Sequence, residues 1–351
     1  MKLPFKILKI SHDKIYDQLF FPQENGWQGG DAACSIKMGN GKVLWLFGDT
    51  IIGKFKNGIR NVQYPHINNS IAITKHYKNG KIDVKYYWKS LNGNPSSFFS
   101  NSKIDKNIYY WPTNGALINN MIIIFCFSVK GNFKGQYLDF WSTVGTNMII
   151  VKNPYDHPEK WQLENIELGI GNDNFGIHSA LYYHSPELYF IGYKNDLKDD
   201  KYSILAKINF QKLIKSKTFN HLLYFSNRNS KNNWSPNLNF ASEIFSPGNT
   251  ESSIVFLENR KIFLCTTYNP LINELCILFS SKITGPWTGP FVVYKNPDHL
   301  NMTYAFRIHQ ALMKDESSII FSYISSPERD IRNDVVDPKF YRPRFLKMDI
   351  V

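Results

Sequence analysis

A two-strand motif recurs five times along this 351-residue chain and limits the folds that it can adopt. Each copy opens with a polar residue and runs through residues that are mostly Gly, Ala or Ser into an apolar stretch. A turn and a second apolar stretch follow. The copies start roughly 50 to 85 residues apart, which is the size of a propeller blade. The opening polar residues are Asp31, Asn114, His178, Glu251 and His309.

The small residues indicate where each copy lies in the fold. The first strand of a propeller blade lines the central axis, where neighbouring blades crowd together and leave room only for small side chains. The polar residue ahead of that strand then points into a funnel at one mouth of the axis. We therefore predict an all-β chain that forms a five-bladed β-propeller with a central funnel. Unrelated hairpins in a β-sandwich are the alternative.

We predict a single domain over residues 1–351. The last blade lacks an obvious closing strand after Ile324. Either the tail at 344–348 or the N-terminal segment at 4–10 can supply it, which would pair the two ends of the chain and remove an open sheet edge. The blades are expected at about 29–90, 108–165, 175–235, 250–295 and 304–351.

The first copy of the motif, at 29–53, contains two aspartates. An Asn40-Gly41 turn between two apolar runs predicts a tight β-hairpin. Asp31 precedes its first strand, expected to begin at Ala32, and Asp49 follows its second strand. Since a hairpin reverses direction, the two carboxylates should be neighbours at one end of it. Taken singly, each aspartate could instead cap a turn.

The distribution of charge along the chain does not indicate a nucleic-acid partner. The formal net charge is +12, but the lysines are scattered and form no dense basic helix or arm. We interpret the charge mainly as a solvated surface. Aromatic residues make up 15% of the chain, which favours sheets and offers flat faces for stacking on sugars.

The cysteines and the N-terminus exclude several classes of protein. Each of the four cysteines lies in an apolar run without a CxxC pair, so buried thiols are expected rather than a zinc site. No run is long enough for a membrane span. Pro4 and Lys6 interrupt the N-terminal apolar run, so no secretory signal is evident. We expect a cytoplasmic protein, or one exported by a route that the sequence does not reveal.

Three carboxylates should meet at the funnel, which is a glycosidase-like set. In glycoside hydrolysis one carboxyl must hold a proton for the leaving oxygen while another stays ionised as base or nucleophile. We predict Glu251 as the acid, because it faces the aspartates across the ring. Asp31 is then the base or nucleophile. Asp49 either orients and tunes Asp31 or exchanges roles with it.

Further side chains near the funnel are candidates for substrate contacts. Aromatic rings stack on sugars, amides and imidazoles hydrogen-bond hydroxyls, and a guanidinium pairs with a carboxylate or an acidic substrate. Structural packing is the alternative for each of them. No cofactor is expected, although the carboxylates and histidines could also hold a hard cation on the axis. The candidates are Asn69, Trp111, Asn114, His178, Tyr304, Arg307 and His309.

The GGDAACSIKMGNGKVLWLFGDTIIG stretch resembles a bacterial family long described as a domain of unknown function. The strand at 69–73, the Thr250-Glu251-Ser252-Ser253 segment and a Gly285-Pro286-Trp287 turn add to the resemblance. This family of five-bladed propellers includes endo-D-arabinanases and is related in architecture to arabinanases and levansucrases. The resemblance implies glycoside hydrolysis of a D-arabinan-like polysaccharide, with Asp31 and Asp49 as catalytic residues. Family members act on cell-wall polysaccharide, whereas this chain lacks a clear export signal.

Two other functions fit the same fold. A carbohydrate-binding propeller without turnover would keep the aromatic residues of the funnel, with its carboxylates too far apart or held in salt bridges. A protein-interaction propeller would carry a large apolar patch on its rim. The set of Asp31, Asp49 and Glu251 favours the hydrolase.

Overall fold

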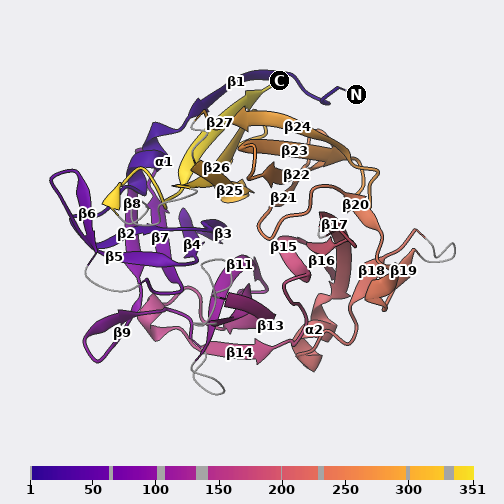
Figure 1. Ribbon diagram of the computed structural model, residues 1–351, viewed down its shortest axis with the longest axis horizontal. Helices are drawn as coiled ribbons and strands as arrows, with labels where there is room; N and C mark the ends of the chain where they lie inside the picture. Colours follow the sequence, from indigo (N-terminus) through magenta and orange to yellow (C-terminus); the bar gives the residue numbers. More distant parts are fainter. Residues whose placement is uncertain are drawn as a thin grey trace.

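Five antiparallel sheets are arranged around a common centre in the computed structural model (Figure 1). Within each sheet, strands that are adjacent in the chain are also adjacent in space for most of the order, as expected for repeated hairpins. In the first four sheets, the strand nearest the centre belongs to the start of the repeated motif (Figure 1). In the fifth sheet the central strand precedes His309, and the residues expected to form the opening strand fold into a 3₁₀ helix, Gln310–Leu312, instead. The structure describes residues 2–62, 66–100, 107–131, 141–198, 200–227, 233–297, 301–327 and 336–351.

The first two sheets each contain four strands in chain order. The first sheet consists of β3 (Cys34–Gly39), β4 (Lys42–Phe47), β7 (Ser70–His76) and β8 (Ile82–Tyr87). The second consists of β11 (Ile108–Ile118), β12 (Met121–Gly131), β13 (Trp141–Val151) and β14 (Leu163–Glu167).

The third and fourth sheets follow the same order. The third consists of β15 (Phe175–His184), β16 (Glu187–Asn195), β17 (Lys201–Asn209), β18 (Leu223–Phe225) and β19 (Trp234–Ser235), and β20 (Glu243–Phe245) pairs with β17. The fourth consists of β21 (Ile254–Leu257), β22 (Ile262–Asn269), β23 (Glu274–Ser280) and β24 (Thr288–Lys295).

The fifth sheet joins the two ends of the chain. Its order is β25 (Asn301–Ile308), β26 (Ser318–Pro327), β27 (Arg344–Ile350) and β1 (Ile7–His12). The terminal strands β1 and β27 are antiparallel, with Ile7 opposite Ile350 and His12 opposite Leu346. Both segments that the sequence offered for the last sheet are therefore part of it, because the C-terminal strand fills the third position and the N-terminal strand the fourth.

Apolar clusters fill the space between neighbouring sheets. Trp45 of β4 and Phe345 of β27 belong to one such cluster, so the first sheet packs against the fifth. Four further clusters join the first sheet to the second, the second to the third, the third to the fourth and the fourth to the fifth. Burial of apolar area between sheets is the main stabilising term of such an arrangement.

The predicted hairpin forms in the first sheet, but it begins two residues later than expected. Cys34 pairs with Leu46, and Lys37 with Val43. Ala32 and Ala33 do not continue the strand, because their φ angles are 65° and 51°. This left-handed conformation is uncommon outside glycine and turns the chain sharply between Asp31 and β3.

Several elements lie outside the five sheets. Two small sheets flank the first sheet: β2 (Asn25–Gly30) with β5 (Thr50–Lys56) and β6 (Ile59–Val62), and β9 (Lys89–Leu91) with β10 (Asn94–Ser96). The described residues contain the α-helices α1 (Lys14–Leu19) and α2 (Phe210–Ser216) and the 3₁₀ helices η2 (Pro158–Lys160), η3 (Leu238–Phe240) and η4 (Gln310–Leu312).

The structure also bears on the cysteines and on membrane-spanning segments. All four cysteines, Cys34, Cys126, Cys265 and Cys276, are buried free thiols. Among the helices of the described ranges, none is long and apolar enough to cross a membrane.

Candidate active site

Asp31 and Asp49 lie side by side at one end of the first sheet, as the hairpin predicts. The Asp31 amide donates to the Asp49 carbonyl at 3.3 Å, and the Gly48 amide donates to the Asp31 carbonyl at 3.2 Å. A Cβ atom on Gly48 would collide with the Asp31 carboxylate. Glycine at position 48 therefore leaves room for the Asp31 carboxylate beside the chain segment that carries Asp49.

The described side chains that hydrogen-bond the two aspartates are uncharged. The hydroxyls of Tyr304 and Tyr341 each donate to Asp31 Oδ2 at 3.3 Å. Trp111 Nε1 donates to Asp49 Oδ1 at 2.8 Å, and the Asn68 side chain also hydrogen-bonds this carboxylate. These donors come from three different sheets or their connections, so the ring brings the aspartates and their partners together.

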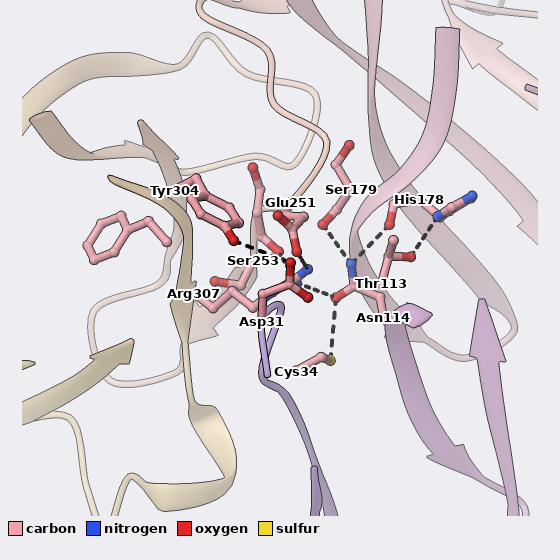
Figure 2. Close-up of polar contacts among 12 residues, drawn as sticks. Asp31, Cys34, Thr113, Asn114, His178, Ser179, Glu251, Ser253, Tyr304 and Arg307 are labelled. Carbon is pink, nitrogen blue, oxygen red and sulfur yellow. Dashed lines mark hydrogen bonds and ion pairs between the residues drawn. The ribbon is translucent and has the colours of Figure 1, made fainter. Parts of the chain in front are cut away.

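Glu251 lies in the same polar cluster and has a cationic neighbour (Figure 2). Arg307 Nη2 lies 3.5 Å from Glu251 Oε1, with the arginine side chain 1% exposed and the glutamate 16% exposed. Arg307 Nη1 donates to the Ser252 carbonyl at 2.9 Å and contacts Asn114 Oδ1 at 3.5 Å. The guanidinium therefore links the inner strands of the second and fifth sheets to the segment that leads into the fourth.

The pKa values of all three carboxyls are raised, and burial is the largest cause in each case. For Asp31 the repulsion from Asp49 and Glu251 adds to burial, and the pKa lies well above its usual value. The pKa of Asp49 rises to about 6, although hydrogen bonds from Trp111 and Asn68 oppose the shift. For Glu251, burial outweighs the attraction of Arg307.

These electrostatics favour a proton distribution that differs from the one expected from the sequence. Arg307 stabilises the ionised form of Glu251, whereas Asp31 has two carboxylate neighbours, and its donors among the described residues are the neutral hydroxyls of two tyrosines. The proton of the ligand-free cluster is therefore favoured on Asp31 rather than on Glu251. The sequence had suggested Glu251 as the acid and Asp31 as the ionised base or nucleophile.

Backbone strain is concentrated at this site. Ala32, Ala33 and Ala305 all have positive φ angles, at 65°, 51° and 52°. They adjoin Asp31 and Tyr304, and a bulge in β25 separates Tyr304 from Arg307. Each such residue costs on the order of 1 kcal/mol and persists only where the surrounding structure enforces it. The strain allows side chains of these segments to converge on one point.

The two histidines of the motif do not reach the carboxylates. His178 is fully buried, with Nδ1 2.7 Å from Thr113 Oγ1 and Nε2 3.1 Å from Thr146 Oγ1. Figure 2 shows its ring pointing away from Asp31 and Glu251, beyond Asn114. His309 is equally buried, between the hydroxyls of Ser35 and Ser322 at 2.9 and 2.8 Å.

We correct the expected role of both histidines from substrate contact to structural support. Burial lowers the pKa of His178 and of His309 to about 3, so both rings are neutral near pH 7. A neutral imidazole can donate from one nitrogen and accept at the other, which matches the two hydroxyls around each ring.

The two asparagines also act within the framework. Asn69 is fully buried; its Nδ2 donates to the carbonyls of Phe99 and Tyr110 at 2.9 Å, and its Oδ1 accepts from the Phe99 amide. The preceding residue, Asn68, hydrogen-bonds Asp49. Asn114 donates to the carbonyls of His178 and Ser179, so it joins the second sheet to the third.

Aromatic residues extend from the carboxylates toward the rim. The Trp111 ring, which hydrogen-bonds Asp49, meets the edge of Trp141 at a centroid distance of 4.9 Å. Trp141 is 44% exposed. Trp111 and Tyr304 were predicted from the sequence, whereas Asn68, Tyr341 and Trp141 were not. Tyr341 comes from the connection before β27, which no repeated pattern marks.

The described part of the chain offers no metal centre. It contains no group of three or more His, Cys, Asp or Glu side chains placed to hold an ion. Among the described residues, the guanidinium of Arg307 places a positive charge beside the Glu251 carboxylate.

Several solved structures share this architecture at very low sequence identity. A candidate hydrolase from Bacteroides ovatus has a TM-score of 0.75 at 14% identity, over 97% of this chain and 90% of that one. The catalytic domain of a GH62 α-L-arabinofuranosidase from Coprinopsis cinerea has a TM-score of 0.53 at 9% identity, over 94% of each chain. The α-L-arabinofuranosidase PaAbf62A from Podospora anserina, in complex with cellotriose, gives 0.52 at 10%, again over 94% of each.

These similarities define the fold class. The chain is an all-β protein that shares its architecture with propeller-type glycoside hydrolases. Within that class it belongs to the family described as Domain of unknown function (DUF5005), which matches residues 13–349. No curated protein matches the sequence.

Proposed function

We propose that this protein is a glycoside hydrolase that cleaves a polysaccharide by carboxylate acid/base catalysis. The observation that carries the proposal is the convergence of Asp31, Asp49 and Glu251, all with raised pKa values, beside partly exposed aromatic rings. Carboxyls that hold a proton near neutral pH are what general acid catalysis on a glycosidic oxygen needs.

The proposal includes the architecture that gathers these groups. We interpret the five sheets as the blades of a single closed propeller over residues 1–351, with the pairing of β1 and β27 completing the last blade. The apolar cluster that joins the first and fifth sheets supports this interpretation. The carboxylates then lie at the mouth of the central funnel.

In the proposed mechanism, Asp31 holds the proton in the resting site and gives it to the leaving oxygen. Asp49 and Glu251 remain ionised. One acts either as the base that takes a proton from the attacking water or as the nucleophile whose covalent bond to the sugar water then hydrolyses, and the other stabilises positive charge that develops on the sugar. Tyr304 and Tyr341 fix the orientation of Asp31 through its Oδ2 atom. Loss of its proton leaves Asp31 anionic, and the two hydroxyl donors stabilise that charge.

A furanoside polysaccharide is the proposed substrate, and D-arabinan is the first candidate. The resemblance of the Gly29–Gly53 stretch to a family with endo-D-arabinanases supports this choice, as does the architecture shared with two α-L-arabinofuranosidases. Trp111 and Trp141 offer ring surfaces that lead outward from Asp49, which suits a chain longer than one sugar.

Hydrolysis of a panel of polysaccharides tests the proposal. D-arabinan, L-arabinan, xylan and β-1,3-galactan are each incubated with the protein, and reducing ends and product sizes are measured. We expect one of them to be cleaved by the wild-type protein and not by an Asp31→Asn, Asp49→Asn double variant. Cleavage by this double variant, with the protein pure, would contradict the proposal.

A binding protein without turnover is the second candidate. The Glu251–Arg307 ion pair favours it, because a carboxylate held by a guanidinium is less available as a base or nucleophile. Retardation of the wild-type protein by a polysaccharide in native gels, without release of any product, would support this function over hydrolysis.

A further inference from the structure

The first sheet has a second hollowed region away from the carboxylates. Two adjoining hollows of about 230 and 430 Å³ share Trp88 and Asn25 in their walls. Residues of β2, β5, β8 and the β9–β10 hairpin form the other walls. His157 and Glu159, which lie between β13 and β14 of the second sheet, complete the wall of the larger hollow. The two small sheets that frame this region do not belong to the repeated four-strand pattern.

Trp88 lies at the junction of the two hollows, and its ring packs closely against a glycine. A Cβ atom on Gly26 would lie 3.1 Å from the Trp88 ring, and Gly26 has a φ of +106°. Only glycine therefore allows the indole to lie across β2 at this point. The Trp88 ring is half-buried, so part of its surface is available to a ligand.

The remaining walls combine rings with hydrogen-bonding groups. Tyr87 lines the larger hollow and meets the His157 ring edge-on at 5.4 Å. Asn25, Lys54, Lys85 and Ser90 are exposed polar residues around the two hollows. Sugars are recognised by this combination, in which a ring covers the apolar face of the sugar and polar groups bind its hydroxyls.

We infer that these hollows form a second carbohydrate-binding groove, which takes an extended glycan chain across Trp88. The inference rests on the proposed function only in taking the ligand of the groove to be a carbohydrate. β2 runs from Asn25 in the groove to Gly30 beside Asp31, a distance of about 17 Å along an extended strand. A polysaccharide held in the groove is therefore kept near the catalytic mouth without touching the carboxylates.

Affinity electrophoresis in gels that contain each of the four polysaccharides tests the groove. The protein carries Asp31→Asn and Asp49→Asn, so that a bound chain is not cut. Adding Trp88→Ala is expected to weaken retardation about fivefold to tenfold, the size of one ring–sugar contact. Phe240→Ala is the control, because Phe240 is 49% exposed on η3 of the third sheet. It should leave retardation unchanged.

A second variant separates loss of the groove from loss of folding. Ser90→Arg fills the smaller hollow from an exposed strand position, and it should weaken retardation with the melting temperature unchanged. In the otherwise wild-type protein, Trp88→Ala should lower hydrolysis of polysaccharide but not of a short oligosaccharide that cannot reach the groove.

The outcomes separate the groove from the proposed function. Retardation that Trp88→Ala and Ser90→Arg both leave unchanged, or no retardation in any gel, would overturn the groove even if hydrolysis is found. Retardation that depends on Trp88, without hydrolysis by the wild-type protein, would keep the groove and overturn the proposed function.

Discussion

The polar residues that open the repeated motif are used in two opposite ways. Asp31 and Glu251 reach a shared polar cluster, where like charges repel one another and Arg307 pairs with Glu251. His178 and His309 occupy the corresponding positions in other sheets but are fully buried, each between two hydroxyls. The same place in the repeat therefore supplies reactive groups in some sheets and structural support in others.

The two groups also have opposite dependences on pH. The carboxyls have raised pKa values, so the folded state binds more protons than the unfolded chain and their contribution to stability falls as pH rises toward about 6 for Asp49. The histidines have lowered pKa values of about 3, so their contribution is complete above about pH 6.5 and is lost as pH falls. The reactive cluster destabilises the fold at neutral pH, whereas the histidines stabilise it.

The largest expected effect is on catalysis at the first sheet. Asp31→Asn and Asp49→Asn should each lower hydrolysis of the identified polysaccharide by about 10³-fold or more, because each removes an acid/base group. Initial rates of reducing-end release measure the loss, and circular dichroism checks the fold. Near-normal turnover in either variant would contradict the proposal that the carboxylates are catalytic whereas the histidines are structural.

Leaving-group dependence distinguishes the roles of Asp31 and Glu251. If Asp31 is the proton donor, Asp31→Asn should retain most activity on an aryl glycoside whose leaving group needs no proton, while losing about 10³-fold or more on polysaccharide. Glu251→Gln should lose activity on both substrates. The reverse pattern would restore Glu251 as the acid, as the sequence suggested.

Removal of a histidine should affect stability rather than catalysis. His178→Ala leaves two buried hydroxyls without the ring and a space between sheets, so the free energy of unfolding should fall by about 2–4 kcal/mol. Urea unfolding measures this change. The kcat of the protein that remains folded should be unchanged, and a selective loss of kcat would place His178 in the catalytic machinery after all.

Neutralising a carboxylate should stabilise the fold. Asp49→Asn removes a group whose pKa rises to about 6, so the free energy of unfolding at pH 7.5 should increase by on the order of 2 kcal/mol. The gain should disappear near pH 4, where Asp49 is protonated in the folded state. Urea unfolding at the two pH values measures it, and an equal gain at both would mean that the effect is not electrostatic.

The smallest expected effect concerns the rim. Trp141→Ala should raise KM for polysaccharide about threefold to tenfold with little change in kcat, because Trp141 meets Trp111 but no carboxylate. Tyr155→Ala, an exposed aromatic residue on the connection after β13, is the matched control and should leave KM unchanged.

The sequence predicted the parts of this structure that depend on local pattern. The spacing of the motif predicted the paired strands, and the reversal of a hairpin predicted that Asp31 and Asp49 are neighbours. The burial of His178 and His309 could not be predicted, because it depends on hydroxyls from other strands and sheets. Tyr341 was missed because it comes from an unpatterned connection. Asn68 was missed because the pattern pointed to its neighbour, Asn69, whereas Asn68 is the residue that reaches Asp49.

The central claim is that the three carboxyls share a proton in a pH range where ordinary carboxyls are ionised. Titration of the Asp and Glu side-chain carboxyls by ¹³C NMR tests it directly and requires no substrate. We predict that Asp49 titrates near pH 6, that Asp31 titrates above its usual range, and that Glu251→Gln lowers the pKa of Asp31 by removing a negative neighbour. Ordinary pKa values near 4 for all three carboxyls would contradict the claim.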